Sequence, residues 1–435
     1  MLLREKDMRL IGIDIGTSSV CAVAIEKETG DCLARETVTS DAFCDSEFPF
    51  EKIQDTEKII AIAKGLLDKF FTPDTVSIGV TGQMHGIVYL DRDGRHIGPL
   101  YTWQDGRGDE PYRDTTYAEH LGIFAGYGCA TDFYNRENGI RPCEAVSFCT
   151  IHDYFVMRLV GRKTPLIHTT NAQSFGCFDE KTLSFSYDFH PEVTGEFAIA
   201  GFYNNIPVGV AIGDNQASVL STLTNEDALL LNFGTGSQIS IISDEKISGV
   251  GIESRPYFEG KYLIVGSALC GGRAYSLLCD FYRSILGEVV DITREEVYNI
   301  MQRQLEEEED IAPLSVDTRF AGTRADSKRR GKIEGISIDN FTPASLTRGV
   351  LVGMAEELLD MYYQMGKTRF FAIASGNAIR KNPHLLKIAG ERFWMPISVP
   401  QHIEEGAYGA ALFGAICGGQ FKSVAEAQSL IRFQR

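Results

Sequence analysis

The sequence predicts an α/β fold made of two related domains, and two features of the chain support this. Strand-like and helix-like patterns alternate along all 435 residues, which is typical of α/β proteins. Residues 11–25 ("IGIDIGTSSVCAVAI") and 228–242 ("ALLLNFGTGSQISII") also share one arrangement: an apolar strand, a Gly-Thr turn with a following Ser, and a second apolar strand. Because the two turns lie about half a chain apart, we expect domains over 1–223 and 224–435 with a cleft between them.

Individual elements can be placed from composition and capping signals. Thr75–Val80 ("TVSIGV") and Ile206–Ile212 ("IPVGVAI") are short, apolar and rich in β-branched residues, which predicts strands. Asp55–Phe70 and Pro343–Met365 have helical patterns, and Thr342 precedes the second as a cap with proline at the first helical position.

Charge and cysteine usage narrow the class of protein. The net charge of −17 argues against a polyanion such as DNA as partner, since phosphate neutralisation needs clustered Lys and Arg. No apolar run approaches the roughly 20 residues of a membrane span, and the N-terminus lacks the apolar core of a signal peptide. The ten cysteines form no C-x-x-C pair, which indicates reduced thiols. We therefore expect a cytoplasmic protein with no nucleic-acid or membrane partner, and a homodimer stays an open alternative.

Both Gly-Thr turns have the composition of a phosphate site. A tight turn exposes successive backbone N–H groups, and small residues such as Gly16 and Gly234 let a phosphate approach them. The hydroxyls that could donate to phosphate oxygens belong to Thr17, Ser18, Thr235 and Ser237. Asp14, at the end of the first strand, could hold Mg²⁺ directly or through water, or it could simply cap the turn.

Two polar loops offer groups that suit a sugar. Gln83, Met84 and His85 lie between two glycines in a strand-to-strand connection, a place where polar side chains commonly face a ligand. An indole gives a flat platform for a sugar ring, while Asp and Arg form directional hydrogen bonds to hydroxyls. One loop holds all three residue types, as Trp103, Asp105 and Arg107. A purely structural role in each loop explains these residues equally well.

The stretch "VGVAIGDNQASVL" at 208–220 supplies a candidate base. A buried strand ends at Gly213, and Asp214 and Asn215 follow immediately before a helical segment. Asp214 could accept the proton of an attacking alcohol while Asn215 holds the substrate, or Asp214 could be an ordinary helix cap. Phosphoryl transfer needs a positioned nucleophile, a base, a metal and phosphate-binding donors, and the chain offers a candidate for each.

With these residues assembled, the chain resembles an FGGY-type carbohydrate kinase of the actin-like ATPase superfamily. The motifs that carry the resemblance keep the family's order and spacing over nearly the whole length: "IGIDIGTSS", "GQMHG", "AIGDNQAS", "NFGTGS", "ASGNAIRKNP" and "EEGAYGAALFGA". The resemblance implies two actin-like (ribonuclease H-like) α/β domains with ATP and Mg²⁺ in the interdomain cleft.

Roles are carried over motif by motif. The resemblance implies that Asp14 binds the metal and Asp214 is the base. It places the phosphates at Gly16, Thr17, Ser18, Gly234, Thr235 and Gly236. It places the adenosine at Ser375, Gly376, Asn377 and Asn382, with a helix starting near Pro383. It places the sugar at Met84, His85, Trp103, Asp105 and Asn215. Where this chain has Ala374, the family often has glycine, and the added methyl group would crowd the adenine side.

Within the family, four segments resemble the sedoheptulokinase pattern: "TWQDGR" (102–107), "GYGCAT" (126–131), "NAQSFGCF" (171–178) and "VGVAIGDNQAS" (208–218). The leading hypothesis is therefore ATP-dependent phosphorylation of the terminal primary hydroxyl of a ketose, sedoheptulose to sedoheptulose 7-phosphate. A xylulokinase or other pentulose kinase is the first alternative, because "GQMHG" is shared with xylulokinases. A sugar-independent ATPase switch of the same superfold is the alternative from another class. A Rossmann dehydrogenase is disfavoured, since no G-x-G-x-x-G opens a helix after the first strand.

Overall fold

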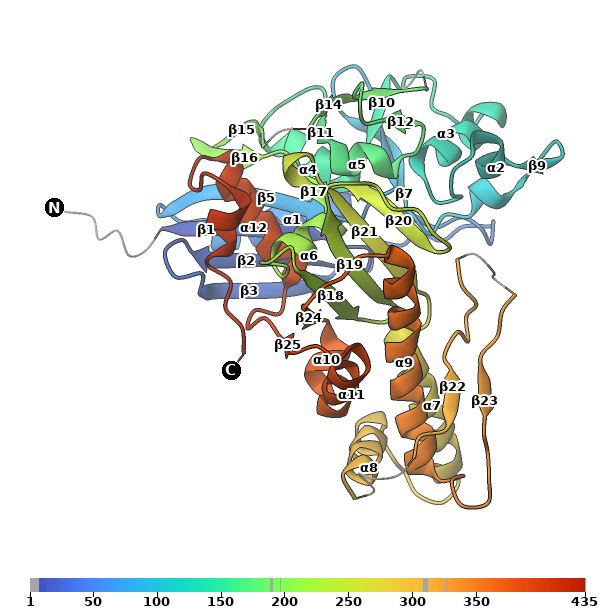
Figure 1. Cartoon of the computed structure of the whole chain (residues 1–435). Coiled ribbons are helices and arrows are strands. Elements are labelled where there is room, and N and C mark those ends of the chain that lie inside the picture. Colours follow the sequence, from blue (N-terminus) through green and yellow to red (C-terminus); the bar gives the residue numbers. More distant parts are fainter. Residues whose placement is uncertain are drawn as a thin grey trace. The chain divides into compact units, whose positions relative to one another are not determined.

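The computed structural model of the chain (Figure 1) describes residues 8–187, 191–195, 197–307, 312–324, 326 and 328–434. The chain forms two compact units, each assembled from separate stretches. The first unit contains Met1–Thr224, Pro256–Gly260 and Glu404–Arg432. The second contains Asn225–Arg255, Lys261–Ile403 and Phe433–Arg435. The expected division into two continuous segments at 223 and 224 therefore does not describe the C-terminal stretch 404–432, which packs with the N-terminal unit.

The first unit is built around a seven-stranded sheet in the order β15-β16-β5-β1-β2-β3, with β17 pairing on β5. Its strands are β1 (Arg9–Ile15), β2 (Ser19–Glu26), β3 (Cys32–Thr39), β5 (Thr75–Gly82), β15 (Ile199–Tyr203), β16 (Ile206–Gly209) and β17 (Ile212–Gly213). The unit's smaller strands are β4 (Ile53–Gln54), β6 (Ile87–Leu90), β7 (His96–Tyr101), β8 (Pro111–Tyr112), β9 (Thr115–Thr116), β10 (Ser147–Cys149), β11 (Leu166–His168), β12 (Phe178–Asp179), β13 (Ser184–Phe185) and β14 (Glu192–Thr194). Its helices are α1 (Thr56–Phe70), α2 (Tyr117–Leu121), α3 (Gly128–Glu137), α4 (Ile151–Leu159), α5 (Thr169–Ser174), α6 (Asp214–Leu220), α12 (Glu405–Cys417) and α13 (Val424–Gln428).

Helix α12 joins this sheet through unusually close packing. It contacts β5, β1 and α6. A Cβ atom built on Gly12 of β1 would lie 1.8 Å from the Ala407 carbonyl oxygen, and one on Gly79 of β5 would lie 1.7 Å from that of Ala410. Only glycine allows the helix backbone to come so near the strands. The small residues of "EEGAYGAALFGA" thus dock a distant segment onto the N-terminal sheet.

The second unit has a six-stranded sheet in the order β20-β21-β19-β18-β24-β25. Its strands are β18 (Ala228–Phe233), β19 (Ser237–Ser243), β20 (Ile252–Pro256), β21 (Tyr262–Ala268), β22 (Ser315–Asp317), β23 (Lys332–Glu334), β24 (Phe371–Ser375) and β25 (Ile397–Ser398). Its helices are α7 (Gly271–Leu286), α8 (Arg294–Glu307), α9 (Pro343–Met365), α10 (Asn377–Lys381) and α11 (Pro383–Phe393). The hydrophobic core includes Leu231 and Ile241 of the sheet and Leu351 of α9, all fully buried.

The two sheets confirm the internal repeat. In the first unit β1 pairs antiparallel with β2 and parallel with β5, and β2 pairs antiparallel with β3. In the second unit β18 pairs antiparallel with β19 and parallel with β24, and β19 pairs antiparallel with β21. In each unit three strands pair antiparallel and a further strand pairs parallel with the first, and in each the Gly-Thr turn joins the first two strands. The α/β class is confirmed.

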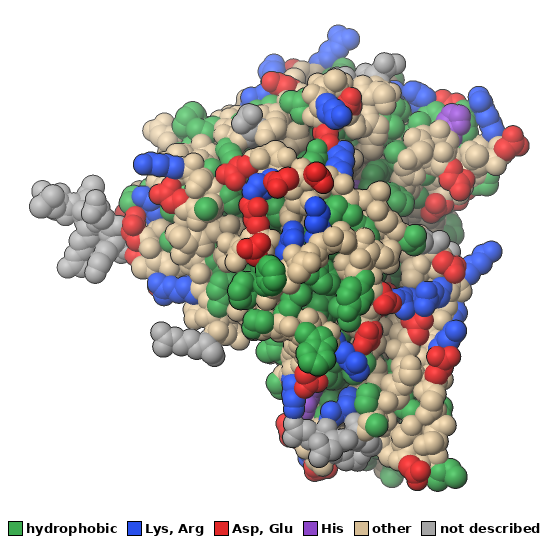
Figure 2. Space-filling view, in the orientation of Figure 1, with side chains coloured by type: hydrophobic (Ala, Val, Ile, Leu, Met, Phe, Trp, Pro, Cys, Tyr) green, Lys and Arg blue, Asp and Glu red, His purple; other side chains and the backbone are tan. Residues whose placement is uncertain are grey.

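The expected helices and capping signals are confirmed as well. Helix α1 begins after Asp55, whose carboxylate accepts from the Lys58 amide at 3.0 Å. Helix α9 begins at Pro343, and the Thr342 side chain caps it. In the described part of the chain, no helix is long and apolar enough to cross a membrane. Lys and Arg side chains are interspersed with Asp and Glu on the face drawn in Figure 2.

Candidate active site

Asp14 lies at the end of β1 beside the first turn of α12. A Cβ atom on Gly406 would approach its Oδ2 to 2.3 Å, so glycine is required there for the carboxylate to fit. Among the described residues, Asp14 accepts no hydrogen bond from its turn, so the capping alternative is not observed. Burial, and then the negative charges of Asp214 and Glu404, raise the pKa of Asp14 to about 7. Asp14 is therefore a carboxylate in an acidic environment, which a cation would stabilise.

Asp214 opens α6 directly after the short strand β17. The cap residue of α6 is Gly213, and no side chain forms a capping hydrogen bond there. Capping therefore does not account for Asp214. Met84 packs against this point, because a Cβ atom on Gly213 would lie 2.6 Å from the Met84 sulfur. Asp214 and Asn215 are both partly exposed, whereas most of α6 after them is buried.

The first Gly-Thr turn is held by a chain of hydrogen bonds. The Thr17 hydroxyl donates to Gln83 Oε1 at 3.3 Å and accepts from Trp103 Nε1 at 2.9 Å. Gln83 Nε2 donates to Gln54 Oε1 at 2.9 Å, and Gln54 Nε2 donates to the Thr17 carbonyl at 2.7 Å. Because a hydroxyl has one hydrogen and that of Thr17 is donated to Gln83, it is not available to a phosphate in this structure. The expected phosphate contact there falls to the backbone N–H groups of the turn and to Ser18, which is exposed.

His85 has an unusual backbone conformation and contacts that fix its ring. Its φ is 72°, in the left-handed region that non-glycine residues rarely adopt. Its ring stacks on Tyr127 with centroids 4.6 Å apart, and its Nδ1 lies 2.9 Å from the Ser174 carbonyl oxygen. Since a carbonyl only accepts, Nδ1 carries the hydrogen and Nε2 is the nitrogen whose protonation can vary. Tyr127 and Ser174 come from two of the segments that resemble the sedoheptulokinase pattern.

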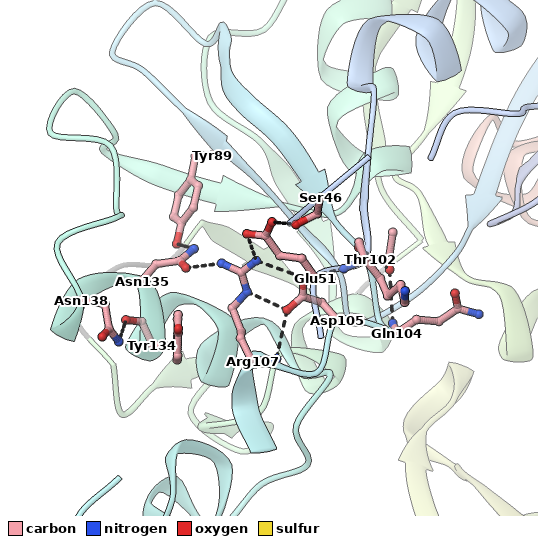
Figure 3. Close-up of polar contacts among 11 residues, drawn as sticks. Ser46, Glu51, Tyr89, Thr102, Gln104, Asp105, Arg107, Tyr134, Asn135 and Asn138 are labelled. Carbon is pink, nitrogen blue, oxygen red and sulfur yellow. Dashed lines mark hydrogen bonds and ion pairs between the residues drawn. The ribbon is translucent and has the colours of Figure 1, made fainter. Parts of the chain in front are cut away.

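Asp105 and Arg107 lie in the interior of the unit rather than facing a ligand (Figure 3). Both side chains are fully buried, and Arg107 Nε donates to Asp105 Oδ1 at 2.6 Å. The guanidinium also donates to Glu51 at 3.0 Å and to Asn135, and it stacks over the Tyr101 ring at 4.3 Å. Asp105 accepts from the Lys52 amide at 3.0 Å as well. Of the two roles expected for this loop, sugar binding or structure, these contacts favour the structural role for Asp105 and Arg107, because their polar atoms are occupied in fixing the loop that carries Trp103.

The second Gly-Thr turn lies between β18 and β19, beside the start of α7. Thr235 and Gly236 are exposed, while Ser237 is buried and so presents no hydroxyl at the surface. The amides of Gly272 and Arg273 donate to the carbonyls of Gly234 and Thr235 at 2.9 and 3.0 Å. The turn's carbonyl groups are thereby tied to α7.

The residues assigned to adenosine lie around the end of β24. Asn232 Nδ2 donates to Ser375 Oγ at 3.1 Å, and Ser375 is buried. Gly376 has a φ of 92°, and Asn377 is exposed at the start of α10. Helix α11 starts at Pro383 as expected, and the Asn382 carboxamide oxygen caps it by accepting from the amides of residues 384 and 385. Ala374 is fully buried in the core of the unit, so its methyl group packs inside the protein.

Three residues near these sites were not singled out from the sequence. Glu404 adds negative charge beside Asp14, Gly406 gives that carboxylate its space, and Tyr127 supports His85. The motif "EEGAYG" contained the signal for the first two. Its distance of almost 400 residues from Asp14 hid the contact.

The donor set around Asp14 is compatible with Mg²⁺ bound to a nucleotide. The described residues contain no group of three or more His, Cys, Asp or Glu side chains arranged to hold a metal ion by themselves. Mg²⁺ usually keeps several waters and binds through one or two carboxylates together with substrate phosphates. Asp14, with Asp214 and Glu404 near enough to raise its pKa, matches that second arrangement.

Known proteins match the chain over most of its length. The N-terminal domain of the FGGY family of carbohydrate kinases matches residues 9–116, and the family's C-terminal domain matches residues 229–417. Human sedoheptulokinase is 27% identical over 92% of this chain and 96% of its own. Two crystal structures share the fold: a "xyloylose kinase" from Brucella ovis (TM-score 0.83, 20% identity, 98% of this chain and 94% of that one) and Plasmodium falciparum glycerol kinase with ADP (0.80, 18%, 99% and 93%). The expected two-domain actin-like ATPase fold is confirmed.

Proposed function

Because the chain belongs to the FGGY family of carbohydrate kinases, we propose that it transfers the γ-phosphoryl group of ATP to the terminal primary hydroxyl of sedoheptulose. The family establishes a phosphotransferase that acts on a sugar with ATP as donor. The choice of sedoheptulose is supported by the human sedoheptulokinase, which aligns with this chain over 96% of its own length.

The observation that carries the mechanism is that Asp14 and Asp214 lie at the same end of one sheet. Asp14 is paired with Thr81 of β5, and Asp214 directly follows β17, which pairs with Thr81 and Gly82 of β5. After burial, the negative charge of Asp214 contributes to raising the pKa of Asp14 to about 7. In the proposed reaction Asp214 accepts the proton of the sugar hydroxyl as the hydroxyl oxygen attacks the γ-phosphorus, and the bond between the γ-phosphorus and the β,γ-bridging oxygen breaks to release ADP. Asp14 would hold the nucleotide's Mg²⁺, which neutralises charge on the phosphates.

The sugar that accepts the phosphoryl group would bind beside the exposed indole of Trp103 and the imidazole of His85. Trp103 is 47% exposed, so one face of its ring is available as a platform for a sugar. His85 would hydrogen-bond a hydroxyl through Nε2, and Asn215 would hold the substrate next to Asp214. Met84 would supply an apolar wall, since it packs on Gly213.

The donor would bind through backbone groups. The turn at 16–18 would offer its N–H groups to the phosphates, and the exposed Thr235 and Gly236 would do the same in the second unit. Ser375, Gly376 and Asn377 would border the adenosine, while Asn382 would act through the cap of α11.

A coupled assay of ADP release tests the proposal. Wild-type enzyme with MgATP is offered sedoheptulose, xylulose, ribulose and glycerol at equal concentrations. The proposal predicts the highest kcat/KM with sedoheptulose. Highest activity with xylulose or ribulose would support the pentulose alternative, and ADP release that no sugar changes would favour the ATPase switch.

A further inference from the structure

The exposed ring of Trp103 is joined by hydrogen bonds to the turn that would hold the phosphates. Its indole nitrogen donates to Thr17 Oγ1 at 2.9 Å, although the two residues are 86 positions apart. The other end of the loop is fixed by the buried Asp105–Arg107 pair. Trp103 is therefore a partly exposed side chain on a rigid loop, with its polar atom directed at the Gly16–Ser18 turn.

Next to Trp103, both the hydroxyl and the carbonyl of Thr17 form hydrogen bonds to other residues. The hydroxyl donates to Gln83, which is 3% exposed, and the carbonyl accepts from Gln54, which is fully buried. Gln83 and Gln54 also bond each other at 2.9 Å. Thr17, Gln83 and Gln54 thus form a closed ring of hydrogen bonds, to which the indole is attached through Thr17. Of these four residues only Trp103 is exposed, so it is the one that a ligand can cover most fully.

We propose that Trp103 and Thr17 couple the two substrates: a ketose stacked on the indole fixes the Trp103–Thr17 hydrogen bond and so pre-organises the Gly16–Ser18 turn for the phosphates of ATP. This inference rests on the proposed function and adds to it a named pair of positioning residues. Ordering of a turn by the first ligand means that the second ligand no longer has to order it, which gives positive cooperativity.

Coupling of this kind is reciprocal, which makes it measurable by binding alone. If a ketose raises the affinity for nucleotide by some factor, nucleotide raises the affinity for the ketose by the same factor. One neutral hydrogen bond contributes about 0.5–1.5 kcal/mol net, so the factor expected from this bond is about 3 to 10.

The chain contains only two tryptophans, which provides the probe. Trp394 is 90% exposed in the second unit, so Trp394→Phe leaves Trp103 as the sole indole fluorophore. In that background, sedoheptulose is titrated with and without a non-hydrolysable ATP analogue and Mg²⁺, and the two dissociation constants are compared. We expect a 3- to 10-fold tighter Kd with nucleotide, a ratio near 1 in Thr17→Val, and restoration in Thr17→Ser, which keeps the hydroxyl.

A second variant removes the same bond from the other side. Trp103→Phe keeps an aromatic face but has no N–H, and its KM for ATP at saturating sedoheptulose should rise about 3- to 10-fold relative to wild type. Combining it with Thr17→Val should add nothing further, because both changes remove one interaction. The coupling would be overturned if the two substitutions together raised the KM for ATP by the product of their separate effects. It would also be overturned if Thr17→Val kept the wild-type ratio of the Kd values for sedoheptulose without and with nucleotide. Absence of any sedoheptulose-dependent ADP release from the wild-type enzyme would instead overturn the proposed substrate.

Discussion

Replacing Asp14 by Asn should stabilise the folded protein while it damages catalysis. Burial and the charges of Asp214 and Glu404 raise the pKa of Asp14 from 3.8 to about 7. The unfolded chain ionises this group more readily than the folded one, so folding stability falls as pH rises from about 4 to about 7. A shift of about three pKa units corresponds to about 4 kcal/mol, which is the upper limit of the stabilisation that Asp14→Asn can give at pH 8. At pH 4.5 Asp14 is already protonated in the folded protein. The same substitution should then stabilise the protein by only about 1 kcal/mol.

Urea unfolding at pH 4.5 and pH 8 measures this difference. In a Trp394→Phe background, Trp103 fluorescence follows the first unit alone, since that unit holds no other tryptophan. Asp45→Asn is the matched control. It removes one negative charge from the same unit, but at an exposed position. We expect Asp14→Asn alone to raise the urea midpoint at pH 8. Its kcat should fall by at least about 10-fold, because removing even a residue that supports a metal ligand costs about 10- to 100-fold. An unchanged or lower midpoint at pH 8 would refute the electrostatic reasoning.

Three further substitutions separate structural from functional roles. Arg107→Met leaves the buried Asp105 carboxylate without its ion-pair partner and should cost about 3–5 kcal/mol in urea unfolding, while the folded fraction keeps its KM for the ketose. A stable variant with a tenfold higher KM would instead support a ligand-binding role for Arg107. Gly79→Ala should lower the free energy of unfolding by about 3 kcal/mol or more, since its Cβ would meet the α12 backbone. Gly65→Ala, on the exposed surface of α1, should raise it by about 0.5–1 kcal/mol. Equal effects of the two substitutions would contradict the docking of α12. Asn382→Ala should lower the free energy of unfolding by about 1 kcal/mol, because the cap of α11 is lost, and should leave the KM for ATP unchanged. A tenfold higher KM for ATP at unaltered stability would instead indicate that Asn382 contacts the nucleotide.

Local sequence signals were sufficient for much of the fold. The two Gly-Thr hairpins and the cap at Thr342 depend on residues a few positions apart, and each occurs where the sequence predicts it. The helix starting at Pro383 was implied by the family resemblance. The return of α12 to the first sheet depends instead on Gly12 and Gly79, which lie hundreds of residues away, and periodicity within a segment carries no information about such a partner.

The site shows the same division between local and distant information. Asp14 and Asp214 could be nominated from strand ends followed by small polar residues. Arg107 could not be interpreted correctly, because its partners Glu51 and Asn135 lie 56 and 28 positions away and turn an exposed-looking loop residue into a buried one. The hydrogen-bond acceptor of the Thr17 hydroxyl, Gln83, likewise lies 66 positions away and could not be predicted from the turn itself.

The most direct test of the central claim is the turnover of Asp214→Asn with MgATP and the best ketose of the panel. The side chain keeps its size but can no longer take a proton, so kcat should fall by about 10²- to 10⁴-fold. Nucleotide affinity should stay within about threefold of wild type. Turnover close to that of the wild-type enzyme would contradict the assignment of Asp214 as the base.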